Sequence, residues 1–135
     1  MTATTIDLPE AGPLLGAYRD SLAEGKLSFQ RCAQCSNAWL PPRDACPACL
    51  SPEWAWEEAS GRGRVLSWVV YHRAYHPAFA DRLPYNVAVV ELDEGPRVVT
   101  NIVDTEGGEG LKIEMPVELE AQHEGDIPVA RFRRV

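Results

Sequence analysis

The residues best suited to chemistry are the four cysteines, which occur as two C-x2-C pairs. Cys32 and Cys35 form the first pair, and Cys46 and Cys49 form the second after ten intervening residues. Each pair has the spacing of a tight knuckle that turns two thiolates to the same side. Four sulfurs brought together in this way can surround one tetrahedral ion. The spacing therefore predicts a four-cysteine site for Zn2+, in the manner of a zinc ribbon.

The predicted ion is structural. Four protein sulfurs leave no open coordination position for water or substrate, so the metal would hold the fold and take no part in a reaction. Iron suits the same thiolate ligands. Two disulfides are disfavoured because they require an oxidising compartment. A thioredoxin-type redox pair is disfavoured because no βαβ pattern accompanies the cysteines.

The remaining residues give little sign of an independent enzyme. His72 and His76 are four residues apart, as in a metal pair on a helix, but Pro77 interrupts the segment and a predicted strand precedes it. We expect a loop with two solvated histidines. The sequence has no G-x-S-x-G, P-loop or G-x-G-x-x-G motif. We therefore expect no catalytic activity from the chain alone.

Composition and charge limit the classes of partner. Hydrophobic residues make up 45% of the 135 and charged residues 24%, as in a soluble globular protein. We find no secretion signal and no apolar run of about 18 residues, and expect a cytoplasmic protein without a membrane span. The net charge is −7. Nucleic-acid binding is disfavoured because it needs a broad cationic face. The four arginines of residues 61–85 form a small positive island that suits one compact anion, or they are scattered surface charges.

The elements that must position these residues begin with a helix. After a lead-in over residues 1–11, Pro13 favours a helix start and Gly25 a helix stop. An apolar stripe within residues 13–24 predicts an amphipathic helix, which either the metal module or a partner subunit must cover. Residues 26–31 are expected to form a strand that leads into the first knuckle. Residues 51–59, with Trp54 and Trp56, are interpreted as a connector.

Five short strands then follow without an intervening helix. Each is rich in β-branched or aromatic residues and is bounded by glycine, proline or aspartate. Glu94-Gly95 is the clearest hairpin turn. The expected fold is mainly β, with an N-terminal amphipathic helix, a four-cysteine zinc ribbon and a five-stranded OB-fold barrel. The strands are residues 65–71, 85–92, 97–103, 117–123 and 129–133. The expected division is 1–25 for the tail and helix, 26–60 for the ribbon and connector, and 61–135 for the barrel.

Several motifs in this order carry a family resemblance. After the helix come EGKLSFQRCAQCSNAWLPPRDACPAC, SGRGRVLSWVVYH, PYNVAVVELDEGPRVVTNIV and MPVEL. Together they resemble the DUF35 family of zinc-ribbon plus OB-fold proteins. Ser36 and Glu114 depart from the pattern, because many members have glycine at these positions. Neither departure removes a predicted metal ligand.

The resemblance implies a function in association with another protein. Members of this family are often non-catalytic subunits of thiolase-fold enzymes, including thiolases, steroid side-chain aldolases and acyltransferases. There they bridge or stabilise the catalytic subunit and help to shape the acyl-CoA site. An autonomous CoA-ester binding protein is the alternative, and a single-stranded nucleic-acid binder is disfavoured by the acidic strands.

The long loop over residues 71–85 is the expected contact with a partner or with acyl-CoA. Long loops in compact domains are often functional, and aromatic and arginine side chains dominate interface energetics. An ordinary surface loop is the plain alternative. The candidate interface residues are Tyr71, His72, Arg73, Tyr75 and Phe79.

Overall fold

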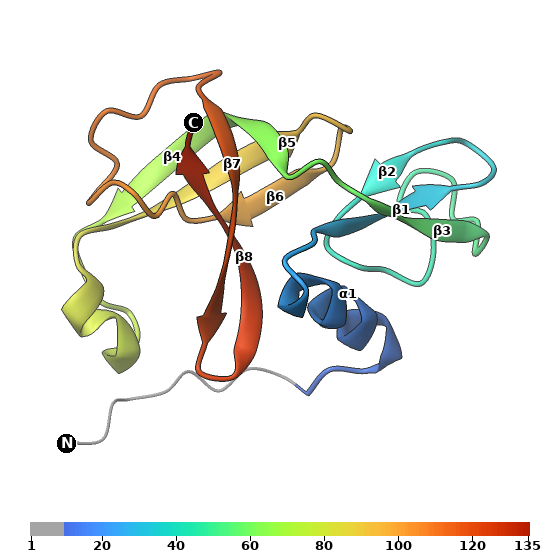
Figure 1. Ribbon diagram of the computed structural model, residues 1–135, viewed down its shortest axis with the longest axis horizontal. Helices are drawn as coiled ribbons and strands as arrows, with labels where there is room; N and C mark the ends of the chain where they lie inside the picture. Colours follow the sequence, from blue (N-terminus) through green and yellow to red (C-terminus); the bar gives the residue numbers. More distant parts are fainter. Residues whose placement is uncertain (1–9) are drawn as a thin grey trace.

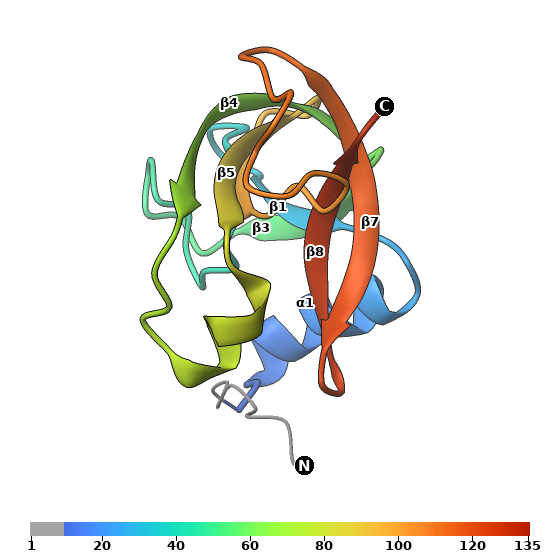
Figure 2. The same cartoon turned by 90° about the vertical axis from the view of Figure 1, so that its left-hand side faces the viewer.

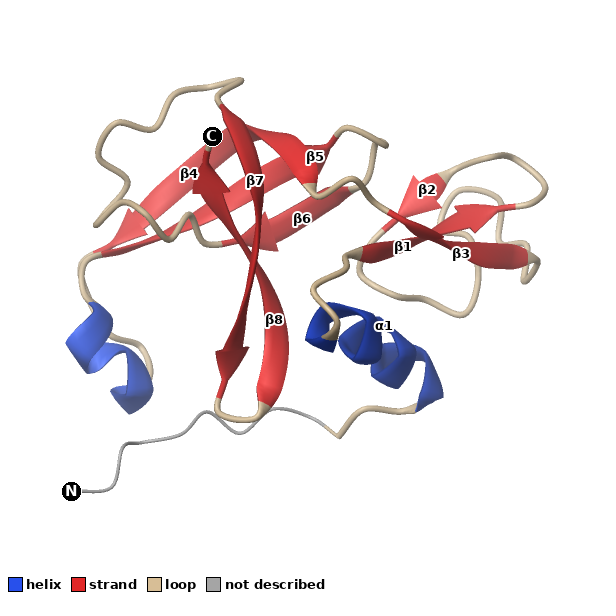
Figure 3. Ribbon diagram, in the orientation of Figure 1, coloured by secondary structure: helices blue, strands red, loops and turns tan. Residues whose placement is uncertain are grey.

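The structure, a computed structural model, describes residues 10–135, and its described elements form one helix, one 3-10 segment and two β-sheets (Figure 1, Figure 3). The lead-in predicted over residues 1–11 therefore lies almost entirely outside the described residues. The elements are α1 (Pro13–Ala23), β1 (Ser28–Cys32), β2 (Ala38–Trp39), β3 (Trp54–Glu58), β4 (Arg62–Tyr71), η1 (Pro77–Arg82), β5 (Tyr85–Leu92), β6 (Arg97–Thr100), β7 (Pro116–Glu124) and β8 (Ile127–Arg134).

The first sheet is the ribbon, with β1 between β2 and β3 and both neighbours antiparallel to it. β1 starts two residues later than predicted and runs into the first cysteine. The predicted connector contains β3, because the chain after the second knuckle is extended and pairs with β1 throughout. Trp54 and Trp56 lie on one face of β3, with ring centroids 5.5 Å apart and ring planes at 85°. Trp54 packs against the cysteine cluster.

The second sheet is the nearly closed barrel predicted from the strand pattern, with order β6-β5-β4-β7-β8. Figure 2 shows β4 and β5 curving around the barrel toward β7 and β8. The described β5 has the predicted bounds, and the turn at Gly95 follows it with φ 112°. Gly63 is required in β4, because a Cβ there would lie 2.5 Å from the Glu91 carbonyl oxygen. This close approach lets the strand bend between β5 and β7.

The prediction for the third barrel strand was too long. β6 ends at Thr100, because the following residues turn away to close the barrel against β8. The buried Asn86 side chain donates to the Ile102 carbonyl at 2.9 Å and accepts from the Ile102 N–H at 2.7 Å. Ile102 and Phe132 then form a parallel bridge between the two edges. The Asn86 amide therefore closes the barrel together with the backbone hydrogen bonds that join Phe132 to Asn101 and Val103.

The helix covers part of the barrel core. α1 packs mainly on β8 and also on β1. The prediction named only the metal module or a partner subunit as the cover, whereas the main cover is a barrel strand. Burial raises the pKa of the Tyr18 phenol to about 12. Leu22 and Leu27 lie in one buried cluster with the barrel residues Val65, Ala88, Val90, Leu92, Val98, Ile102, Leu111, Val117 and Phe132. The helix and the start of the ribbon thus share a core with the barrel.

Candidate metal centre and partner surface

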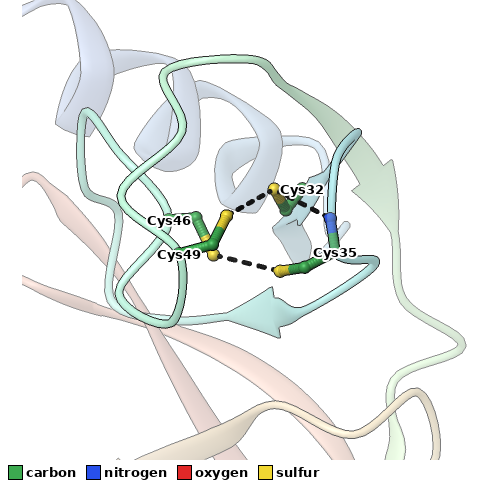
Figure 4. Close-up of side chains that lie close together, drawn as sticks. All are labelled: Cys32, Cys35, Cys46 and Cys49. Carbon is green, nitrogen blue, oxygen red and sulfur yellow. Dashed lines mark hydrogen bonds between the residues drawn. The ribbon is translucent and has the colours of Figure 1, made fainter.

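The structure brings the four cysteine sulfurs together between the two knuckles (Figure 4). All four Sγ atoms lie within 4.8 Å of one another. Cys32 and Cys49 are 3.5 Å apart, and Cys35 and Cys46 are 3.6 Å apart. These separations fit a tetrahedron, in which Zn–S bonds of about 2.3 Å place sulfurs about 3.8 Å apart. They are far longer than the S–S bond of about 2.05 Å in a disulfide. All four cysteines are free thiols.

The two knuckles have the same backbone design. In the first, the Ser36 N–H donates to the Cys32 carbonyl at 3.1 Å, and in the second the Leu50 N–H donates to the Cys46 carbonyl at 2.8 Å. The residue after each second cysteine is left-handed, with φ 64° at Ser36 and 66° at Leu50. The departure from glycine at Ser36 thus falls on a backbone conformation that favours glycine.

Backbone N–H groups inside the knuckles support thiolates. The Gln34 N–H donates to the Cys32 sulfur at 3.3 Å, and the Ala48 N–H donates to the Cys46 sulfur at 3.4 Å. Burial raises the pKa of the Cys46 thiol, but the backbone N–H groups of Cys49 and Ala48 outweigh it and lower that pKa to about 6. This donor set favours a soft, thiolate-binding cation.

The close packing of the sulfurs raises the pKa of Cys49. The Ser51 backbone hydrogen bond lowers the pKa of Cys49, but the hydrogen bond with Cys32, burial and the other thiols together raise it to about 12. A fourth thiolate therefore requires a positive charge at the centre of the cluster.

The ribbon has a small core of its own, beside which the β1 residues Phe29 and Gln30 are also buried. Its buried cluster consists of Cys32, Trp39 and Cys46, with Trp54 packed against it. Two of the three buried members are thus predicted metal ligands. Removal of the ion would leave this module without the centre around which it packs.

A second group of side chains, the predicted interface residues, lies on the β4–β5 connection. Tyr71 and Tyr85 stack with ring centroids 5.1 Å apart, and Phe79 stacks on Tyr85 at 5.2 Å. Tyr75 meets the edge of Tyr71, and the Arg73 guanidinium lies 5.3 Å from the Tyr75 ring centroid. Four of the five residues predicted for this surface therefore belong to one cluster. We call Tyr71, Arg73, Tyr75, Phe79 and Tyr85 the aromatic cluster.

The histidines of this connection lie apart from that cluster's stacking. His72 is exposed. His76 caps η1, where its Nδ1 accepts a hydrogen bond from the Ala78 N–H at 3.0 Å, and its ring meets the edge of Phe79. Among residues 10–135, the cysteines are the one group of potential metal ligands that converge. The prediction of a loop with two solvated histidines agrees with this placement, because His72 and His76 are both exposed.

Sequence reasoning missed the residues that fix this connection to the barrel. Arg82 donates twice to Glu124, at 2.5 and 3.0 Å, and its guanidinium lies 4.9 Å from the Phe79 ring centroid. Arg131 donates to the same carboxylate. The hydrogen bonds from Arg82, reinforced by those from Arg131, outweigh burial and lower the pKa of Glu124 to about 2. No local signal reveals a pair 42 residues apart in the chain.

Two of the four arginines in the positive island of residues 61–85 are neutralised by carboxylates. Arg64 pairs with Glu91 and with Glu114, each at 2.6 Å, and Arg82 pairs with Glu124. Beside this last pair, at the mouth of the barrel, lies a hollow of about 540 Å³. Aromatic, amide and charged side chains line it, among them Phe79, Tyr85, Asn101, Arg131 and His123.

The described fold and cysteine cluster define the class as a zinc-ribbon protein with an OB-like barrel. The family model "ChsH2, rubredoxin-like zinc ribbon domain" matches residues 19–55, and "ChsH2, C-terminal OB-fold domain" matches residues 56–122. The chain belongs to the DUF35 family. A solved structure described as "Ltp2-ChsH2(DUF35) aldolase" has a chain that is 37% identical to this one. The two chains match with a TM-score of 0.79 over 94% of this chain and 98% of that chain.

Three curated relatives share part of their length with the chain. A "Probable enoyl-CoA hydratase alpha subunit" of Thermomonospora curvata is 44% identical over 83% of this chain and 35% of its own. A "DUF35 domain-containing scaffold protein" of Methanothermobacter thermautotrophicus is 42% identical over 58% of this chain and 59% of its own. A "DUF35 domain-containing scaffold protein" of Methanocaldococcus jannaschii is 37% identical over 65% of this chain and 62% of its own. The chain thus matches about a third of the first relative and about three fifths of the other two.

A more distant solved structure shares the fold alone. It is a DUF35 protein of unknown function from Sulfolobus solfataricus, 13% identical, with a TM-score of 0.64 over 92% of this chain. In the part of the chain that the structure describes, no helix is long and apolar enough to cross a membrane.

Proposed function

We propose that the chain is a non-catalytic accessory subunit of a thiolase-like acyl-CoA-processing complex, in which it bridges or stabilises the catalytic subunit. The observation that supports this most is the similarity, over nearly the full length of both chains, to a DUF35 chain described together with Ltp2 in an aldolase. The description of two archaeal relatives as scaffold proteins supports the same role.

In this proposal the four cysteines hold a structural Zn2+. The separations of the sulfurs and the N–H donors around them fit such an ion, and iron suits the same ligands. When bound, the ion supplies the positive charge that lets all four sulfurs remain thiolates. Cys32, Cys35, Cys46 and Cys49 then tie the two knuckles together. The closed ligand set leaves no position for substrate.

The partner or acyl-CoA interface in this proposal is the β4–β5 connection. Tyr71, His72, Arg73, Tyr75 and Phe79 remain the proposed contact residues. All five are at least partly exposed, and all but His72 belong to the aromatic cluster. The hollow of about 540 Å³ beside Phe79 is where an acyl-CoA thioester would touch this chain. The paired Arg82 and Glu124 form part of its lining and hold the wall in place.

The test is capture with a tagged chain from its native host, followed by measurement of the mass of the complex. We expect a stoichiometric thiolase-fold protein to co-elute. A chain that elutes alone at every concentration contradicts the proposal. The hollow suggests one alternative, an autonomous CoA-ester binding protein, which would bind acyl-CoA without a partner. Calorimetry of the isolated chain with acetyl-CoA and with a bulky acyl-CoA tests this alternative. A salt-dependent oligonucleotide titration checks the nucleic-acid alternative.

A further inference from the structure

The outer side of strands β4, β5 and β6 carries a stripe of valines. The register places Val69 opposite Val87 and Val89 opposite Val99, all pointing away from the barrel core. Val69 is 55% exposed and Val99 is 73% exposed, while the two valines of β5 are half-buried. We call these four residues the outer valine face.

Apolar residues occur on both sides of these strands, with one exposed polar residue, Ser67, opposite Val89 on the outer side. The inward positions that alternate with the outer valines are Ala88, Val90 and Val98, which are buried in the barrel core. A strand with one side in water normally alternates apolar and polar residues, whereas strands covered on both sides are apolar throughout. The pattern therefore indicates that a second layer covers the outer valine face. Within residues 10–135, the exposure of Val69 and Val99 shows that this layer is absent.

The outer valine face and the aromatic cluster form one surface. Tyr71 and Tyr85 pair at the end of the same two strands, on the same side as the valines. A shallow hollow of about 450 Å³ joins the two, and its lining includes Tyr75, Phe79, Val87 and Val99. Aromatic anchors beside an apolar centre are the composition of an interface core.

Charges at the two ends of this surface specify what can dock there. At the aromatic end, Arg73 contacts the Tyr75 ring and forms no ion pair with any residue from 10 to 135. At the far end, Glu91 is held between Arg64 at 2.6 Å and Arg97 at 3.4 Å. The surface thus has an unneutralised cation at one end although the chain has a net charge of −7. A complementary partner presents an apolar patch with a carboxylate at the Arg73 end.

A second copy of the chain fits this surface poorly. A two-fold contact would place Arg73 either against its own copy or against the far end of the other face. The first arrangement opposes two cations. In the second, the carboxylates Glu91 and Glu114 are already bound by Arg64. A different protein with its own carboxylate is therefore the better occupant.

We infer that the outer valine face, together with the aromatic cluster, is the docking surface for the catalytic partner, whose contact region is apolar with a carboxylate opposite Arg73. This inference rests on the proposed function and extends the predicted loop interface onto the strands. It assigns the central contact to Val69, Val87, Val89 and Val99.

The test uses the full-length, metal-loaded chain and the thiolase-fold subunit purified with it from the native host. Val69→Lys, Val99→Lys and Arg73→Glu alter the proposed surface, and Ile113→Lys is the matched control because Ile113 is 59% exposed on a loop outside it. Far-UV circular dichroism and zinc content verify that each variant folds. We expect each lysine variant to raise the Kd at least about 30-fold, as expected for an interface hot spot. Arg73→Glu should weaken binding and reverse its salt dependence, while Ile113→Lys should bind like the wild type.

Other outcomes overturn the inference in distinguishable ways. If all four variants bind a thiolase-fold subunit like the wild type, the docking surface is wrong and the proposed function stands. If the wild type forms only a self-dimer that Val99→Lys dissociates, the surface is real but its assignment to a catalytic partner is wrong. If the wild type captures no thiolase-fold subunit, the proposed function and this inference both fail.

Discussion

Ser36 and Leu50 occupy equivalent positions in the two knuckles and share a left-handed backbone, with φ 64° and 66°. A side chain with a Cβ is strained in this conformation, whereas glycine adopts it freely. We therefore expect Ser36→Gly and Leu50→Gly each to stabilise the metal-loaded protein by about 0.5 to 1 kcal/mol. Urea unfolding with excess zinc measures the change. Ser36→Ala is the control, and an equal gain from alanine would show that backbone strain is not the cause.

Leu50 has a further property that the knuckle geometry does not explain. Its side chain is 76% exposed, in contrast to the buried ligands Cys32 and Cys46 beside it. Nothing among the described residues explains why leucine stands there.

Metal removal should unfold the ribbon before the barrel. The ribbon cluster is built on Cys32 and Cys46, while Leu27 belongs to the barrel core. Chelation, or Cys35→Ser, is therefore expected to lower amide protection from β1 through β3 by more than about 100-fold, because zinc-binding free energy is folding free energy. Hydrogen exchange followed by mass spectrometry measures this protection. β5 should remain protected, and equal loss in both sheets would show that they unfold as one unit.

Asn86 should be among the residues most important for barrel closure. Asn86→Ala leaves the N–H and carbonyl of Ile102 without their side-chain partner in a buried position. We expect a loss of about 2 to 3 kcal/mol in the free energy of unfolding. The matched control is Asn101→Ala, which removes one hydrogen bond, to the Asn86 carbonyl at 2.6 Å. Denaturant unfolding of both variants tests the difference, and equal losses would contradict the assigned role.

Glu124 should make stability depend on pH below about 4.5. Its folded pKa is about 2 and its ordinary value is 4.5, so its contribution is complete above pH 4.5 and disappears as the pH falls toward 2. Near neutral pH, Glu124→Gln should lose about 1 to 2 kcal/mol, less than the full shift implies because the ion pairs lie partly in solvent. Unfolding at several pH values measures this loss. If the wild type and the variant differed in free energy of unfolding by the same amount from pH 6 to pH 3, the link between Glu124 protonation and stability would be excluded.

Local patterns predicted much of the fold. The C-x2-C spacing predicted the four converging sulfurs, and the β-branched and aromatic residues of 85–92 predicted β5 with the bounds that the structure has. Contacts between distant residues were beyond such reasoning. The end of β6 depends on Asn86 binding Ile102, and the wall of the barrel mouth depends on Arg82 binding Glu124. The cover of the helix by β8 is of the same kind.

The proposed interface shows the same limit. Rings within the loop were recognised from composition, but Tyr85 joins them only because β4 and β5 pair in register. The outer valines belong to strands that the sequence predicted from their β-branched residues. Only the strand register, which places Val99 opposite Val89, shows that they form one continuous face.

The proposed role as a non-catalytic accessory subunit is tested most directly by steady-state turnover of acyl-CoA. Turnover is measured for the isolated chain, for the co-purified thiolase-fold subunit, and for the two mixed at equal concentration. We expect no turnover by the chain, weak or unstable activity of the partner alone, and full activity on mixing. Turnover by the chain alone, or a partner whose rate and stability are unchanged when the chain is absent, would contradict the proposed accessory role.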